Sequence, residues 1–238
     1  MNKTKISYLT HTWNPTHGCS PVSEGCKFCW AKTMSKRLAG MGVKGYSRDE
    51  PFKVVCCPEN LDEPLRIKKP SRIGVSFMGD LFHDVPDDFI TRIAIAQTEA
   101  PQHDYLWLTK RPKRMAEYIK KHSVPKLAWL GVSVENQKTW DERSVILRKI
   151  RASILWISFE PLLENINMGD ISWLTWAVIG TESGNNRREC KIEWIRDVVN
   201  QCKHAHVPVF VKQIQINGKV IKDINQFPDD LKVREYPK

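Results

Sequence analysis

Short apolar runs alternate with amphipathic segments along most of this chain, and this alternation predicts a parallel α/β fold. The runs have the length of strands and are almost continuously apolar, as expected of strands covered on both faces. The predicted strands are 6–13, 72–78, 104–109, 127–134, 154–159, 176–180 and 208–214. The predicted helices are 28–39, 86–99, 112–121, 137–150 and 191–205. The segment 43–71 is interrupted by prolines, which predicts irregular structure with a small strand at 52–56.

The number of strand–helix units favours a partial (β/α)6–7 barrel or an open sheet over a full eight-fold barrel. No internal repeat, low-complexity tract or long polar linker interrupts the chain. We therefore expect one domain over 1–238, with 214–238 as a C-terminal extension. In such folds the residues that bind ligands gather at the carboxyl ends of the strands.

Polar or glycine-containing sequence follows nearly every predicted strand. These strand-end residues are Gly79, Asp80, Lys110, Arg111, Ser133, Glu135, Glu160, Glu182 and Lys212. Each one alone is also compatible with a helix cap or a solvated turn. Their recurrence at successive strand ends favours a common site.

The most informative stretch is the loop after the first predicted strand, which holds Cys19, Cys26 and Cys29 in a C-x6-C-x2-C spacing. Three thiolates on one loop can hold three corners of a cubic iron–sulfur cluster, which leaves the fourth iron open to a small molecule. The spacing is also compatible with a zinc site, in which His17 or His11 supplies the fourth ligand. A third interpretation is a set of ordinary buried thiols.

Cysteine usage and hydropathy indicate the cellular compartment in which the protein is found. The chain has seven cysteines, an odd number with three on one loop, which favours reduced thiols and metal over disulfides. No apolar run has the length needed to span a bilayer, and the N-terminus lacks the apolar region of a secretion signal. These features predict a soluble cytoplasmic protein with no membrane partner.

Charge suggests a polyanionic partner. The net charge is +10, from 37 basic and 27 acidic residues. Such an excess is typical of proteins that bind nucleic acid, because neutralised phosphates release counterions, although it is also compatible with a merely basic, soluble surface. The basic residues cluster at Lys68, Lys69 and Arg72, at Lys110, Arg111, Lys113 and Arg114, and at Arg143, Arg148, Lys149 and Arg151.

Seven ordered segments resemble a family of phage and bacterial proteins with a three-cysteine motif, within the radical S-adenosylmethionine superfamily. The segments are TWNPTHGCSPVSEGCKFCWA, MGDLFHDVPDDF, LTKRPKRM, LGVSVENQ, SFEPLL, IGTESGNNRR and FVKQ. The chain departs from the usual C-x3-C-x2-C spacing by three residues on the first side. It also has Trp30 where the family usually has tyrosine, and Thr181 where the family usually has a second glycine.

The resemblance implies that Cys19, Cys26 and Cys29 bind a [4Fe-4S] cluster whose open iron chelates S-adenosylmethionine. It implies that Gly79 and Asp80 receive the methionine amino group, and that Ser133 and Glu135 meet the ribose or the methionine carboxylate. Glu160, Glu182 and Lys212 are the candidate catalytic residues of the site. A reducing electron donor is an implied partner.

The substrate that the resemblance and the charge favour is a modified thymine base in phage DNA, or its free nucleotide, in the host cytoplasm. The reaction would be an isomerase or mutase step in DNA hypermodification. One alternative is a radical enzyme for a peptide or small metabolite. Such enzymes often carry a further cluster, but Cys56 and Cys57 are adjacent and Cys190 and Cys202 lie far along the chain, so buried or loop thiols are the favoured interpretation of these four cysteines. Another alternative is a non-catalytic nucleic-acid-binding protein that carries zinc or a cluster. A protein that presents the substrate is a further candidate partner.

Overall fold

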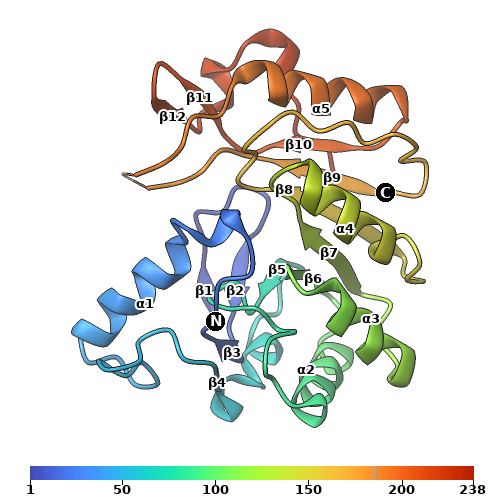
Figure 1. Cartoon of the computed structure of the whole chain (residues 1–238). Helices are drawn as coiled ribbons and strands as arrows, with labels where there is room; N and C mark the ends of the chain where they lie inside the picture. Colours follow the sequence, from blue (N-terminus) through green and yellow to red (C-terminus); the bar gives the residue numbers. More distant parts are fainter. Residues whose placement is uncertain (185) are drawn as a thin grey trace. The chain divides into compact units, whose positions relative to one another are not determined.

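The computed structural model describes residues 1–184 and 186–238 and has an α/β fold (Figure 1). Its main sheet has eight strands, in the order β1 (Asn2–Lys3), β2 (His11–Trp13), β5 (Arg72–Val75), β6 (Asp104–Thr109), β7 (Ala128–Ser133), β8 (Ile154–Phe159), β9 (Trp176–Ile179) and β10 (Val209–Val211). Strand β1 is antiparallel to β2, whereas β2, β5 and β6 are parallel, as are β8, β9 and β10. The prediction of a mostly parallel α/β sheet is therefore confirmed.

The chain divides into two compact units. The first comprises residues 1–22 and 29–130, and the second comprises residues 23–28 and 131–238. The cysteine loop is shared between them, since Cys19 and Cys29 belong to the first unit and Cys26 to the second. The predicted single domain over 1–238 stays a prediction.

The first unit contains three helices and a small second sheet. The helices are α1 (Trp30–Gly40), α2 (Asp87–Glu99) and α3 (Pro112–Lys121), and the short 3-10 turns are η2 (Pro58–Asn60) and η3 (Glu63–Arg66). Strand β3 (Thr16–His17) pairs antiparallel with β4 (Val55–Cys56). Apolar side chains of the parallel strands form the core, among them the fully buried Trp13, Ile73 and Trp107.

The second unit contains α4 (Gln137–Leu147) and α5 (Ile192–His204), and α5 packs along β9 and β10. Its remaining elements are η1 (Glu24–Cys26), β11 (Ile214–Ile216), β12 (Lys219–Ile221), η4 (Ile224–Gln226) and η5 (Asp229–Leu231). Strands β11 and β12 form a hairpin whose turn residues Asn217 and Gly218 have φ of 48° and 72°. Both positive φ values are typical of a two-residue hairpin turn.

Several predicted boundaries are wrong for local reasons. The predicted strand 6–13 shortens to β2, because the Leu9 amide closes a turn on the Ile6 carbonyl and buries Tyr8 and Leu9 in the core. The predicted strand 208–214 ends at Val211, and Ile214 begins the β11–β12 hairpin. The predicted helix 28–39 begins at Trp30. Among the described residues, no helix has the length and apolar character needed to cross a membrane.

Candidate functional site

Backbone contacts fix the position of Cys19 in the first unit. The Gly18 amide donates to the Met78 carbonyl at 3.0 Å, and the Cys19 amide donates to the Phe52 carbonyl at 3.0 Å. The backbone of Gly79 lies so close to that of Gly18 that a Cβ atom at position 79 would be 2.5 Å from the Gly18 carbonyl oxygen. Glycine is therefore required at position 79 for the approach, since no side chain fits between the two backbones.

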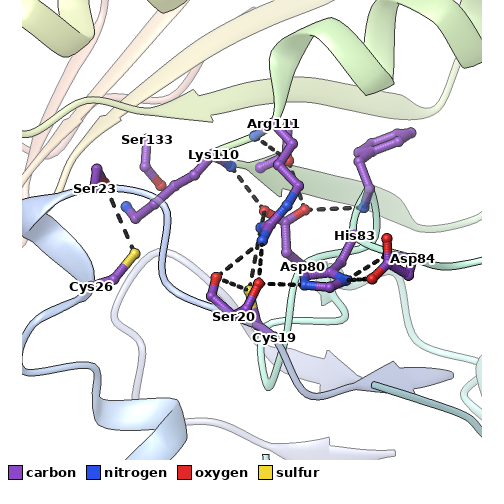
Figure 2. A network of polar contacts seen from close by, with 12 residues as sticks. Cys19, Ser20, Ser23, Cys26, Asp80, His83, Asp84, Lys110, Arg111 and Ser133 are labelled. Atoms are coloured by element: carbon purple, nitrogen blue, oxygen red, sulfur yellow. Dashed lines mark hydrogen bonds and ion pairs between the residues drawn. The ribbon is translucent and has the colours of Figure 1, made fainter. Parts of the chain in front are cut away.

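Arg111 connects Cys19 to the carboxyl ends of β5 and β6 (Figure 2). Its Nη1 donates to the Cys19 Sγ at 3.3 Å and to the Asp80 Oδ2 at 3.1 Å. Its Nη2 donates to the Ser20 carbonyl oxygen at 3.0 Å and to the Ser20 Oγ at 3.2 Å. Because β2, β5 and β6 are parallel, residues that follow them in sequence meet at one edge of the sheet.

Asp80 organises this edge. Its side chain is buried, and its oxygens accept hydrogen bonds from the Thr109 hydroxyl at 2.6 Å and from the Phe82 and Lys110 amides at 3.0 Å each. Together with Arg111, these donors occupy both carboxylate oxygens. The structure thus brings together Gly79, Asp80 and Cys19, and it engages the Asp80 carboxylate with donors of the protein itself.

His83 extends the network on the side of Ser20 (Figure 2). One of its ring nitrogens lies 2.7 Å from the Ser20 Oγ, and the other lies 3.0 Å from the Asp84 carboxylate. Burial, and after it the positive charge of Arg111, lowers the pKa of His83, which favours a neutral ring at neutral pH. Sequence reasoning missed His83 because the residue follows no strand directly.

In the second unit, Glu135 holds the segment that carries Cys26. The Ser23 hydroxyl donates to the fully buried Glu135 carboxylate and lies 3.9 Å from the Cys26 Sγ. Arg143 donates to the Glu135 Oε2 at 2.8 Å and to the Ser133 carbonyl oxygen at 2.7 Å. The ion pair supplies the counter-charge that a buried carboxylate needs.

Glu182 holds the same segment through a second arginine. Arg188 donates to both Glu182 oxygens, with a shortest distance of 2.6 Å, and to the Glu24 carbonyl oxygen at 3.1 Å. Its guanidinium also lies 5.5 Å from the centre of the Phe28 ring. Arg143 and Arg188 were missed as site residues, although the proximity of Arg188 to Glu182 in one motif was a signal for the pair.

Glu160 and Lys212 form an ion pair at the carboxyl ends of β8 and β10. The Ser158 hydroxyl donates to the second oxygen of Glu160 at 3.1 Å. Beside them, the buried Gln213 amide donates to the Thr181 carbonyl oxygen at 2.7 Å. The three predicted catalytic residues therefore lie in one unit, each of them in an ion pair, and their catalytic role stays a prediction.

The three cysteines of the loop, Cys19, Cys26 and Cys29, are in no disulfide bond. Cys19, Cys26 and Cys29 are half-buried, and Cys29 is the N-cap residue of α1. Among the described residues, no group of three or more histidine, cysteine, aspartate or glutamate side chains is arranged to hold a metal ion. The fit of the loop to a cluster rests on its donor set, which consists of three thiols on one loop that are in no disulfide bond.

The other cysteines lie in less reactive surroundings. Burial raises the pKa of Cys57 to about 11 and that of Cys190 and Cys202 to about 12. Thiols with these pKa values are almost fully protonated at neutral pH and are poor metal ligands. The expectation that the spare cysteines are buried or loop thiols agrees with these surroundings, which do not favour an auxiliary cluster.

The candidate zinc histidines have different surroundings. His17 is buried and stacks on Tyr46 with ring centroids 4.2 Å apart, and its ring nitrogens have no hydrogen-bond partner among the described residues. His11 is half-buried and lies 3.1 Å from the Thr10 hydroxyl. Burial lowers the pKa of both rings, which keeps them in the neutral form that binds metals.

Residues 3–226 match the family described as "Protein of unknown function (DUF5131)", and the chain belongs to this family. No curated protein matches the chain. No solved structure matches it either.

Proposed function

We propose that this protein is a radical S-adenosylmethionine enzyme. The single observation that carries the proposal is the cysteine loop, whose first thiol is fixed by backbone hydrogen bonds beside the carboxyl ends of parallel strands. Enzymes with parallel α/β sheets bind their ligands at that edge. We also infer that the sheet belongs to a partial (β/α)6–7 barrel of the radical S-adenosylmethionine type and that the protein is cytoplasmic.

In this proposal Cys19, Cys26 and Cys29 hold a [4Fe-4S] cluster. When bound, such a cluster would supply one electron, taken from a low-potential reductant, for the reductive cleavage of S-adenosylmethionine to methionine and a 5′-deoxyadenosyl group able to abstract a hydrogen atom. Gly79 keeps the loop close to β5, so that the first thiol stays at the strand ends. The pairs of Glu135 with Arg143 and of Glu182 with Arg188 support the segment around the second thiol.

The candidate catalytic pair is Glu160 with Lys212. A carboxylate and an ammonium group in contact can orient a polar substrate and hold a proton between them. The buried apolar side chains of the strands exclude water, which protects a carbon radical from quenching. The Ser133 carbonyl oxygen accepts a hydrogen bond from Arg143, and the contact of Ser133 with S-adenosylmethionine is part of this proposal.

We propose a modified thymine base in DNA, or its free nucleotide, as the substrate, and an isomerase or mutase reaction. The support is the net charge of +10 and the basic residues after β6. Arg111 and Arg114 of this group are engaged in ion pairs with Asp80 and Asp87, whereas Lys113 is exposed. Lys113 is therefore better placed than either arginine to meet a phosphate.

The test of the cofactor chemistry is anaerobic turnover of the reconstituted protein with dithionite and S-adenosylmethionine. We expect methionine and 5′-deoxyadenosine, detected by mass spectrometry, in equal amounts. Cys26→Ala should abolish both products, and Cys56→Ala, which removes a half-buried thiol outside the loop, should leave them unchanged. Equal product from wild type and Cys26→Ala would contradict the proposal.

Two outcomes would favour the other interpretations. Tightly bound zinc with no response to S-adenosylmethionine would favour a non-catalytic nucleic-acid-binding protein. Turnover without any binding of DNA or nucleotide at low salt would favour a peptide or small metabolite as substrate.

A further inference from the structure

Arg111 has a role that follows from its contacts with the cysteine loop. Four hydrogen bonds leave its guanidinium, of which one reaches the Cys19 Sγ, one reaches Asp80 and two reach Ser20. The group thus joins the first thiol of the loop to the carboxylate at the end of β5. A planar guanidinium suits this bridge because its donors point in fixed directions.

The backbone around Arg111 holds the guanidinium in place. Its amide donates to the Thr109 Oγ1 at 2.9 Å, and the Thr109 hydroxyl donates in turn to Asp80. Pro112 begins α3 directly afterwards, and its ring restricts the backbone at the start of the helix. The bridge is therefore built largely before any ligand binds.

The guanidinium stays charged and is only partly screened by water. Its side chain is 17% exposed. Its ion pair with Asp80 leaves it close to the Cys19 Sγ, and an arginine guanidinium keeps its proton in proteins. A permanent positive charge in contact with a sulfur atom stabilises negative charge on that sulfur.

We propose that Arg111 is a positioning residue that donates a hydrogen bond to the Cys19 sulfur in the cluster-loaded protein and thereby raises the reduction potential of the cluster. The inference rests on the proposed function. Hydrogen bonds to the ligand sulfurs and nearby charge are two of the factors that set cluster potentials. Reduction adds one electron to the cluster from dithionite, and the added negative charge is stabilised by the nearby cation.

The experiment is an anaerobic redox titration of the reconstituted protein with dithionite, followed by electron paramagnetic resonance, in wild type, Arg111→Gln and Arg111→Lys. Glutamine removes the positive charge, whereas lysine keeps the charge but lacks the planar set of hydrogen-bond donors of a guanidinium. Arg66→Gln is the matched control. The Arg66 guanidinium pairs with Asp62, as the Arg111 guanidinium pairs with Asp80, and both pairs lie in the first unit.

At the wild-type midpoint potential, we expect the ratio of reduced to oxidised cluster in Arg111→Gln to fall about tenfold, as for the loss of one charge-assisted hydrogen bond. For a one-electron couple this corresponds to a midpoint about 59 mV more negative. Arg111→Lys should lie between Arg111→Gln and wild type, and Arg66→Gln should match wild type. A purely structural role would lower the amount of cluster without changing the potential of the cluster that assembles.

Equal midpoints in wild type and both Arg111 variants would overturn the inference while leaving the proposed function intact. If Arg111→Gln assembles no cluster, the lysine variant decides, since a midpoint below wild type supports the inference and an equal midpoint overturns it. If the wild-type protein itself assembles no cluster, the proposed function fails first, and the inference fails with it.

Discussion

Gly79→Ala should destabilise the protein because the new methyl group has no space. A Cβ atom at this position would lie 2.5 Å from the Gly18 carbonyl oxygen, 2.9 Å from the Gly18 nitrogen and 3.0 Å from the His17 carbonyl carbon. All three are backbone atoms, which cannot turn away as a side chain does. Overpacking of this kind costs about 1–3 kcal/mol.

For a chain of this size, that cost lowers the midpoint of thermal unfolding by roughly 2–12 °C. The assay is thermal unfolding followed by circular dichroism. The matched control is Gly40→Ala at the end of α1, where a Cβ atom meets no other atom within 4 Å. Since alanine favours the helix, the control should unfold at the wild-type temperature or slightly above it.

The displaced backbone is that of the two residues before Cys19, so Gly79→Ala should also reduce the amount of iron that the reconstituted protein retains. Gly40→Ala should bind as much iron as wild type. An unchanged unfolding temperature and iron content in Gly79→Ala would refute the view that this glycine fixes the cysteine loop.

Three further predictions concern charge and thiol chemistry. Lys113→Ala should weaken DNA binding and reduce the slope of log affinity against log salt by about one. Arg114→Ala should change the slope less, because the charge of Arg114 is paired with Asp87. Equal slopes in Lys113→Ala and wild type would show that Lys113 does not contact a phosphate. Glu160→Gln should leave the iron content unchanged and lower substrate turnover about tenfold, because its ion pair with Lys212 is lost; wild-type turnover would remove Glu160 from the site. Burial raises the pKa of Cys190 and Cys202 to about 12, so iodoacetamide at pH 8 should alkylate them far more slowly in the native protein than after unfolding. The rate, measured by mass spectrometry, should increase as the pH rises toward 12. Rapid alkylation of the native protein at pH 8 would contradict their protonated state.

The sequence predicted the parallel sheet because its strands are buried on both faces. Strand β6 and helix α3 have the predicted bounds, since an apolar run ends at Thr109 and a proline begins the next helix. The pattern failed at 6–13, where apolar residues are buried by a turn. An apolar run shows that a segment is buried, but it does not distinguish a short strand from a turn folded into the core.

The candidate site was predictable in its residue types but not in its contacts. Asp80 and Glu135 were found because they follow strands. Their arginine partners come from other positions in the sequence, and only the folded chain shows that Arg111 reaches Cys19 and that Arg143 reaches Glu135. Long side chains select partners by three-dimensional reach, which spacing along the chain does not reveal.

Electron paramagnetic resonance of the anaerobically reconstituted and reduced protein, recorded with and without S-adenosylmethionine, tests whether the three-cysteine loop forms a radical-enzyme centre. The account predicts a [4Fe-4S] signal whose shape changes when S-adenosylmethionine is added and which is absent in Cys26→Ala. A colourless protein that retains zinc, or a cluster signal that S-adenosylmethionine leaves unchanged, would contradict it.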